Sequence, residues 1–206
     1  MLKLYYAPGT ISIAVAITLE EAGLPYETVK VDFKSAQQRL PDYLSINAKG
    51  RVPALILQDG TVLTETGALL EYIASISPAA QLIPADPTLA AHMRSAMFYL
   101  ASTMHVAHAH KMRGSRWATQ QSSFDDMAAL VPQTMAACAT YVETHLLRGT
   151  SVLTQGFSIA DPYLFVVCNW LEGDGVHLSD YPKIQNFMTM METRQSVKTI
   201  REKAML

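Results

Sequence analysis

The sequence predicts two domains, a small α/β domain followed by a larger domain made only of helices. Strand and helix patterns alternate over residues 1–76, which is typical of helices packed on a sheet. A proline-containing break follows, and beyond it the apolar residues recur only at helical spacing. We therefore predict an α/β domain over residues 1–77, a linker over 78–88 and an all-helical domain over 89–206.

The first strand is predicted at Leu2–Tyr6, before the turn Ala7-Pro8-Gly9. Isoleucines, leucines and alanines at helical spacing then predict a helix that Gly23 ends, and Tyr26–Val31 is predicted as a second strand. One helix between two strands is a βαβ unit, so we expect these strands to be parallel with a right-handed crossover.

An antiparallel pair of strands completes the predicted sheet. Ala54–Leu57 and Thr61–Leu63 flank Asp59-Gly60, which is a hairpin turn signal. Apolar residues at helical spacing up to Ile76 then predict a second helix. The first domain is thus a four-stranded mixed sheet with helices packed on it.

The second domain shows four helical stripes of apolar residues, over 89–107, 124–142, 159–170 and 184–191. Residues 159–170 are apolar nearly all round, which predicts a helix buried among other helices. Pro132 lies inside the second stripe, so we expect that helix to kink at the proline or to begin later.

The composition fits a folded globular chain, because half of the 206 residues are hydrophobic and 17% are charged. The formal net charge is −2, and no basic stripe indicates nucleic acid or an anionic membrane surface. No apolar run reaches the ~18 residues that a membrane-spanning helix needs. The first residues carry no signal-peptide pattern, and Cys138 and Cys168 form no paired motif. We expect buried reduced thiols and a cytoplasmic location, with a disulfide or a reactive thiol as the alternative.

The segment Pro8-Gly9-Thr10-Ile11-Ser12 joins the first strand to the first helix. A helix N-terminus offers unpaired N–H groups and the positive end of a dipole, and the hydroxyls of Thr10 and Ser12 can donate to an anion there. Ordinary helix capping is the alternative for these two residues.

Three further segments carry polar groups at predicted element ends. A cis bond before Pro53 would leave the N–H and C=O of Val52 free to pair with an extended peptide. Glu65 suits an ammonium group, and Thr66 with the helix N–H groups suits a carboxylate, although an ordinary N-cap is the alternative. Ser158–Asp161 has the form of a capping box, which is a structural role on any interpretation.

Together these segments resemble the cytosolic glutathione transferase family. The family combines a thioredoxin-like domain that contains N-x-K-G-x-V-P and then E-T with a helical domain that contains S-I-A-D. Here these motifs are Asn47–Pro53, Glu65-Thr66 and Ser158–Asp161. The resemblance covers essentially the whole chain, and Leu4–Gly9 and Ile17–Glu21 are similar to bacterial beta-class members.

The resemblance implies a binding site for glutathione in the thioredoxin-like domain. Val52 would pair its backbone with the cysteinyl part of the tripeptide, beside a cis Pro53 and next to Arg51. Glu65 and Thr66 would hold its γ-glutamyl end.

The residues around the sulfur depart from the beta-class pattern. Beta-class members typically contain P-G-A-C-S where this chain has P-G-T-I-S, so their cysteine falls on Ile11, which cannot form a mixed disulfide with glutathione. We expect the hydroxyl of Ser12, with Thr10, to stabilise the thiolate as in serine-type members, and Tyr6 is the fallback donor. His105 matches a beta-class histidine that faces the bound sulfur.

The resemblance also implies a pocket for a second substrate in the helical domain. We expect that pocket to be lined by Phe98, His105, Met112, Arg113 and Trp117. The implied activity is conjugation of the glutathione thiolate to an apolar electrophile, a detoxification reaction, by a cytoplasmic homodimer.

Other functions remain open on the same fold. One is a non-catalytic binding or scaffold protein, and another is a glutathione-dependent peroxidase, isomerase or dehalogenase. His105, His108 and His110 suggest a metal site, but helical spacing turns His110 away and no nearby Cys or Asp completes it. We expect no metal, and neither a nucleic acid nor a membrane as partner.

Overall fold

The computed structural model describes residues 1–206, which form two compact units. One unit contains Met1–Pro84 together with Glu192–Leu206, and the other contains Ala85–Met191. The segment 192–206 therefore packs with the first unit although it follows the helical unit in the sequence. None of the helices combines the length and the apolar character that crossing a membrane requires.

The first unit is built on one four-stranded sheet of order β2-β1-β3-β4. Its strands are β1 (Leu2–Tyr6), β2 (Tyr26–Lys30), β3 (Ala54–Ile56) and β4 (Val62–Thr64). β1 runs parallel to β2, whereas β3 is antiparallel to both β1 and β4. The predicted mixed sheet and its parallel βαβ unit are confirmed.

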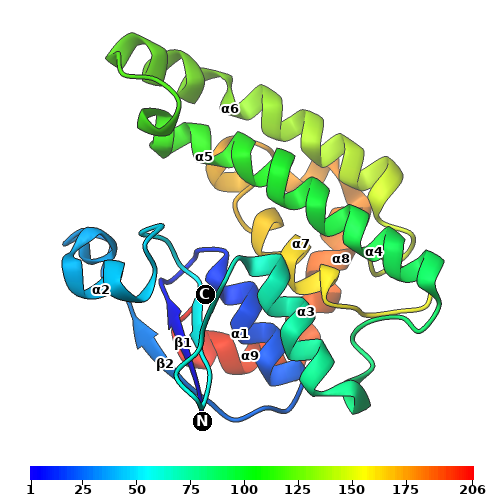
Figure 1. The fold of residues 1–206 in the computed structure, drawn as a ribbon. Helices are drawn as coiled ribbons and strands as arrows, with labels where there is room; N and C mark the ends of the chain where they lie inside the picture. Colours follow the sequence, from blue (N-terminus) through cyan, green and yellow to red (C-terminus); the bar gives the residue numbers. More distant parts are fainter. The chain divides into compact units, whose positions relative to one another are not determined.

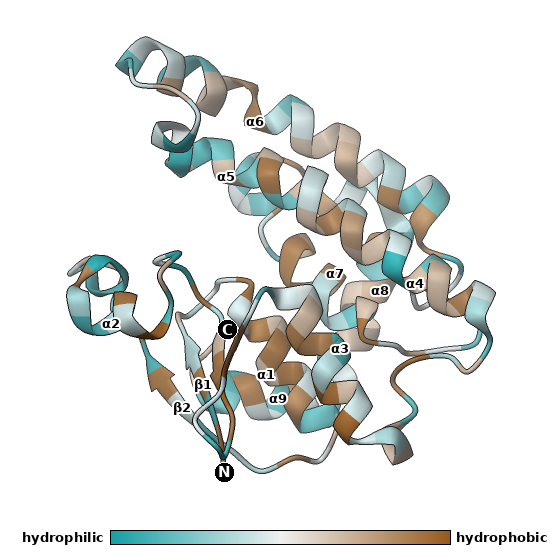
Figure 2. Ribbon diagram, viewed as in Figure 1, coloured by the Kyte–Doolittle hydropathy of each residue, from teal (hydrophilic) through white to brown (hydrophobic).

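Helix α1 (Ser12–Glu21) packs against the sheet, against α3 (Thr66–Ile76) and against α9 (Gln195–Glu202) (Figure 1). It is buried from Ser12 to Leu19, because its sequence is apolar on nearly every side. Figure 2 accordingly shows this helix in brown over most of its length. The other face of the sheet carries the short helices η1 (Gln37–Arg39) and α2 (Pro41–Ile46), and Tyr43 of α2 packs on Tyr5 with ring centroids 5.9 Å apart.

The second unit is entirely helical. Its main helices are α4 (Pro87–Tyr99), α5 (His105–Arg113), α6 (Gln121–Tyr141), α7 (Ala160–Cys168) and α8 (Pro182–Thr193). Two π-helical segments, η3 (Leu100–Met104) and η5 (Val142–Leu146), continue α4 and α6. Short 3₁₀ turns are η2 (Pro78–Ala80), η4 (Gly114–Arg116), η6 (Glu172–Asp174) and η7 (Leu178–Asp180). Every residue of α7 is buried, as its all-round apolar sequence predicts.

Three details differ from the sequence-based expectation. The stripe over 89–107 is one helical run, but a π-helical segment divides it into α4 and α5. Pro132 lies inside α6 without ending it, and α6 begins at Gln121, earlier than predicted. Helix α9 was not predicted at all. Both cysteines are buried free thiols, as expected.

Candidate functional site

The turn between β1 and α1 presents unpaired backbone donors. Gly9 has a positive φ of 67°, a conformation that costs glycine little. The backbone N–H groups of Ile11 and Ser12 donate to no acceptor in the protein, because they precede the first intrahelical hydrogen bonds of α1. Two N–H groups and the positive end of the helix dipole are thus available to an anion at this turn.

Two hydroxyls lie beside these N–H groups, and they differ in access. The Oγ1 of Thr10 and the Oγ of Ser12 are 2.7 Å apart, and Thr10 also donates to the carbonyl oxygen of Ala7 at 2.7 Å. Ser12 is fully buried and accepts a hydrogen bond from the Ala7 N–H at 3.2 Å, whereas Thr10 is half-buried. Thr10 therefore carries the more accessible of the two hydroxyls, and the buried Ser12 hydroxyl is its hydrogen-bond partner.

The segment before β3 offers an unpaired peptide group. The bond between Val52 and Pro53 is cis, and neither the N–H nor the C=O of Val52 has a partner in the protein. The preceding carbonyl, that of Arg51, accepts hydrogen bonds from the Tyr43 hydroxyl and the Asn47 amide, each at 2.7 Å. Burial raises the pKa of Tyr43 to about 12, so its hydroxyl stays a donor at neutral pH. Tyr43 and Asn47 thus fix the backbone that presents Val52.

Sequence reasoning missed the supporting role of Tyr43. Asn47 belongs to the N-x-K-G-x-V-P motif and was available as a signal, but Tyr43 lies outside it. In the same region the buried Oε1 of Gln38 has no hydrogen-bond partner in the protein.

The start of α3 combines an acid with unpaired donors. The N–H groups of Thr66, Gly67 and Ala68 have no backbone acceptor, and the Thr66 hydroxyl has no partner in the protein. Glu65 precedes them with a positive φ of 74°, a strained conformation for a residue with a side chain. The Oε1 of Glu65 lies 2.5 Å from the ammonium nitrogen of Lys49, so its carboxylate already holds a cationic nitrogen.

Strand register brings these segments to one edge of the sheet. Tyr5 of β1 is opposite Ala54 of β3, and Ala54 is opposite Thr64 of β4. Because β3 is antiparallel to both neighbours, the residues after Tyr5, those before Ala54 and those after Thr64 emerge on the same side. The turn at 7–12, the cis bond at 52–53 and the start of α3 therefore converge.

Tyr6 lies apart from the hydroxyl network of this edge. It shares the buried face of β1 with Leu2 and Leu4 and is 8% exposed. It makes no hydrogen bond with Thr10 or Ser12. Arg51 is exposed beside Val52.

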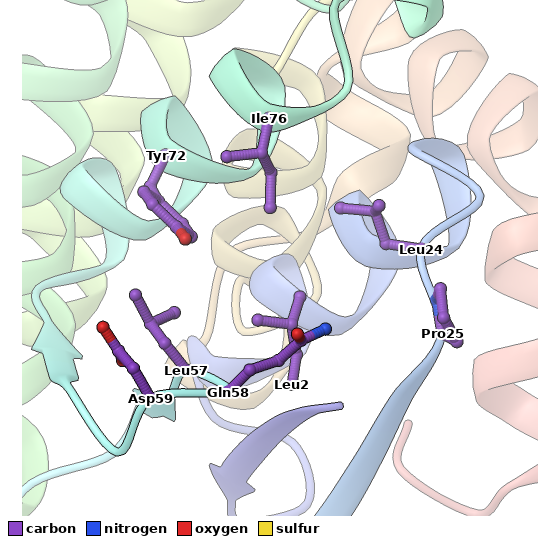
Figure 3. A pocket seen from close by; sticks show the side chains of 8 residues that line it. All are labelled: Leu2, Leu24, Pro25, Leu57, Gln58, Asp59, Tyr72 and Ile76. Carbon is purple, nitrogen blue, oxygen red and sulfur yellow. The ribbon is translucent and has the colours of Figure 1, made fainter.

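A separate cavity of about 340 Å³ lies where β1 begins (Figure 3). It is lined by Leu2, Leu24, Pro25, Leu57, Gln58, Asp59, Tyr72 and Ile76. Since β1 runs from Leu2 at this cavity to Tyr6 at the turn, the cavity occupies the opposite end of the strand from the unpaired donors. None of the predicted site residues lines it.

In the helical unit the predicted apolar side chains are exposed but do not form one cluster. Phe98, at the end of α4, is 72% exposed, and Met112, near the end of α5, is 78% exposed. Fourteen helical positions separate them, which is about 21 Å along the axis. Arg113 and Trp117 follow Met112, and the Trp117 ring meets His110 edge-on with centroids 4.6 Å apart. Met112, Arg113 and Trp117 thus lie near one another in the chain, whereas Phe98 lies well away from them.

His105 belongs to an aromatic cluster that sequence reasoning did not find. Its ring centroid is 5.0 Å from that of Trp170, and the His108 ring stacks on the same indole at 4.2 Å. The Nδ1 of His108 lies 2.6 Å from a carboxylate oxygen of the buried Asp174, to which Lys111 also pairs. No group of three or more His, Cys, Asp or Glu side chains gathers in an arrangement that could hold a metal ion.

The capping box at the start of α7 is confirmed. Asp161 accepts hydrogen bonds from the N–H and the hydroxyl of Ser158, at 2.7 and 3.1 Å, and from the Val152 N–H at 2.8 Å. Both Ser158 and Asp161 are at most 1% exposed. These contacts fix the start of the buried helix, so the role of the motif is structural.

The fold and this sheet edge define a class of protein, one with a thioredoxin-like unit that presents a peptide group beside a cis proline, together with a helical unit. A sequence model described as the N-terminal domain of glutathione S-transferase matches residues 1–75. Glutathione S-transferase GstA of Escherichia coli O157:H7 is 32% identical over 199 residues, which is 96% of each chain. The chain belongs to the glutathione S-transferase family.

Solved structures show the same similarity. A glutathione transferase homologue from Sulfitobacter with bound glutathione is 68% identical, with a TM-score of 0.99 over 100% of this chain and 99% of that one. A sphingomonad glutathione S-transferase in complex with glutathione is 30% identical, with a TM-score of 0.85 over 98% of each chain.

Proposed function

We propose that the protein binds glutathione along the sheet edge described above and transfers its thiolate to an apolar electrophile. The observation that carries this proposal is the convergence of three unpaired groups, namely the N–H groups at the start of α1, the peptide group of Val52 and the start of α3. These are the donors and acceptors that an extended tripeptide with two carboxylates, an ammonium and a thiol requires.

Each end of the tripeptide has a matching group. The α-carboxylate of the γ-glutamyl residue meets the Thr66 hydroxyl and the free N–H groups of α3, and its ammonium meets Glu65. The pairing of Lys49 with Glu65 supports this role, because it shows that an amine nitrogen fits at the carboxylate. Val52 pairs with the cysteinyl residue, and the exposed Arg51 supplies a cation for the glycyl carboxylate.

The thiol of the cysteinyl residue is activated by hydrogen bonding to its ionised form. A free thiol has a pKa of about 8.5, and shifting it by ~2 units requires about 2.7 kcal/mol of preferential stabilisation. The Thr10 hydroxyl and the N–H groups of Ile11 and Ser12 supply donors for this purpose. This is a hydroxyl-type mechanism in which Ser12 holds Thr10 rather than donating directly, and Tyr6 is the remaining alternative donor.

The second substrate is an apolar electrophile bound by the helical unit. Met112 and Trp117 provide exposed apolar surface there, with Arg113 beside them, and Phe98 provides a separate exposed apolar position. His105 is the polar residue proposed to face the bound sulfur. We further propose a cytoplasmic homodimer, as the family resemblance implies.

The test compares three ligands by calorimetry and by the ultraviolet absorbance of the thiolate. Reduced glutathione is expected to bind and to show thiolate at pH 7, S-methylglutathione to bind without that absorbance, and cysteinylglycine to bind much more weakly because it lacks the γ-glutamyl group. Equal affinity for glutathione and cysteinylglycine would contradict the assigned roles of Glu65 and Thr66. Binding of glutathione without thiolate or turnover would favour a non-catalytic binding protein.

A further inference from the structure

The segment 203–206 reaches the turn that carries the thiol-activating groups. The Gly9 N–H donates a hydrogen bond to the carbonyl oxygen of Met205 at 3.0 Å, and Met205 is 1% exposed. Figure 1 shows the C-terminus beside the end of β1 and the start of α1. The backbone of Met205 therefore contacts the backbone of Gly9, the residue that precedes Thr10.

The residues that lead to this segment, from Arg194 to Lys203, are bonded to the far end of α1. Arg194 donates two hydrogen bonds to the carboxylate of Glu21, from Nε at 2.6 Å and from Nη2 at 2.7 Å. Ser196 donates to Glu21 as well, and Lys203 pairs with Glu20 at 2.6 Å. Residues 194–205 thus hold the last turn of α1 through side chains and the turn before α1 through a backbone carbonyl.

The hydroxyls of Thr10 and Ser12 make hydrogen bonds within the turn, but the turn has few backbone-to-backbone hydrogen bonds of its own. Pro8 has no N–H, and the hydrogen bond from the Thr10 N–H to the Ala7 carbonyl is long, at 3.3 Å. Glycine has more backbone freedom than any other residue type. At Gly9 no neighbouring atom lies within 4 Å of the position that a β-carbon would take, so packing does not restrict it there. An acceptor on the Gly9 N–H restricts the freedom of this peptide.

We infer that Met205 is a positioning residue for thiol activation, because its carbonyl holds Gly9 and thereby orients the Thr10 hydroxyl and the N–H groups that follow it. The inference rests on the proposed function, in which those groups stabilise the thiolate. Met205 does not touch the substrate. Its removal is expected to change the pKa of the bound thiol while leaving the groups that hold the rest of the tripeptide in place.

The experiment compares a chain ending at Ala204 with a control chain ending at Met205. Both end in a carboxylate, but only the control keeps an acceptor at Gly9. For the chain ending at Ala204 we expect a higher pKa of bound glutathione and about three- to tenfold less thiolate at pH 7. Its kcat should recover at high pH and its KM for glutathione should change little.

Equal thiol pKa values in the two shortened chains would overturn the inference. If the wild type itself binds glutathione without thiolate, the proposed activation fails as well as the inference. If the wild type shows thiolate but the two shortened chains have equal thiol pKa values, only the inference fails, so the two failures are distinguishable. Amide hydrogen exchange on the wild-type protein gives a measurement that needs no variant. The Gly9 amide is expected to exchange slowly, and unprotected exchange there would also overturn the inference.

Discussion

The hydroxyl oxygens of Thr10 and Ser12 lie 2.7 Å apart, and the Ala7 N–H already donates to Ser12. Each hydroxyl has a single proton to donate. The Ser12 hydroxyl oxygen is nearer to that of Thr10 than to the Ala7 carbonyl oxygen, which is 3.3 Å away. If Ser12 therefore donates to Thr10, the Thr10 proton points at the Ala7 carbonyl or at a ligand. In that arrangement an anion bound at the turn can accept a hydrogen bond from the Thr10 hydroxyl while the bond between Thr10 and Ser12 is kept.

Replacing Thr10 by valine removes this donor while keeping the shape of the side chain. We expect the pKa of bound glutathione to rise by about one unit, since a hydrogen bond to a charged group contributes about 1.5–3 kcal/mol and the helix N–H groups remain. The measurement is ultraviolet titration of the bound thiol. Thr10→Ser keeps the hydroxyl and should retain most of the thiolate, and equal titration curves for the valine and serine variants would exclude Thr10 as the donor.

Ser12→Ala is expected to act on folding as well as on activity. It leaves the buried Ala7 N–H without its acceptor, which costs about 1–3 kcal/mol of unfolding free energy. Urea unfolding measures that loss. The thiol pKa should rise less than in Thr10→Val, because the Thr10 hydroxyl is still present. A larger rise in Ser12→Ala than in Thr10→Val would return the donor role to Ser12.

Glu65→Gln tests recognition of the γ-glutamyl ammonium. The substitution keeps size and removes charge, so we expect about tenfold weaker binding of glutathione by calorimetry. Asp59→Asn is the matched control, because it removes one negative charge near the cavity at the other end of the sheet. If both variants weaken binding equally, the effect comes from net charge and not from a contact at Glu65.

Asp161→Ala is expected to lower the unfolding free energy by about 3 kcal/mol or more. It leaves the buried N–H groups of Val152 and Ser158 without acceptors at the start of α7. Thermal unfolding measures the change. Asp161→Asn keeps one carbonyl oxygen and should lose less, whereas an equal loss in both variants would show that the charge, rather than the acceptors, matters.

Cys168 should make the protein less stable at alkaline pH. Complete burial raises the pKa of its thiol above the value of about 8.5 for a free cysteine. The folded state therefore keeps a proton that the unfolded state loses, and the unfolding free energy should fall by up to about 1.4 kcal/mol per pH unit above pH ~8.5. Urea unfolding between pH 8 and 10 under reducing conditions measures the slope. In Cys168→Ala that slope should be smaller, and an unchanged slope would assign it to other groups.

The strands and the cap of α7 could be predicted because their signals are local. Leu2–Tyr6 is a short apolar run bounded by a turn, and Ser158 and Asp161 stand at capping-box spacing before an apolar helix. Helix α9 has no comparable signal. Its buried apolar residues are only Val197 and Ile200, and packing on α1 with the pairs to Glu20 and Glu21 stabilises it.

The site could be predicted as a set of segments but not as a set of contacts. Thr10 and Ser12 are both hydroxyl residues at a helix start, and only the path of the backbone decides that Ser12 is buried and Thr10 is accessible. The link from His105 to Trp170 joins residues far apart in the sequence, and no spacing rule relates them. The π-helical segment η3 likewise leaves no mark in the apolar pattern that predicted one long helix.

The return of residues 192–206 to the first unit has a consequence for biosynthesis. During translation the sheet and α1 leave the ribosome long before residues 194–205, which form hydrogen bonds and ion pairs with Glu20, Glu21 and Gly9. The whole helical unit must be synthesised in between. The turn at residues 7–12 can therefore acquire its hydrogen bond to Met205 only after the helical unit has emerged.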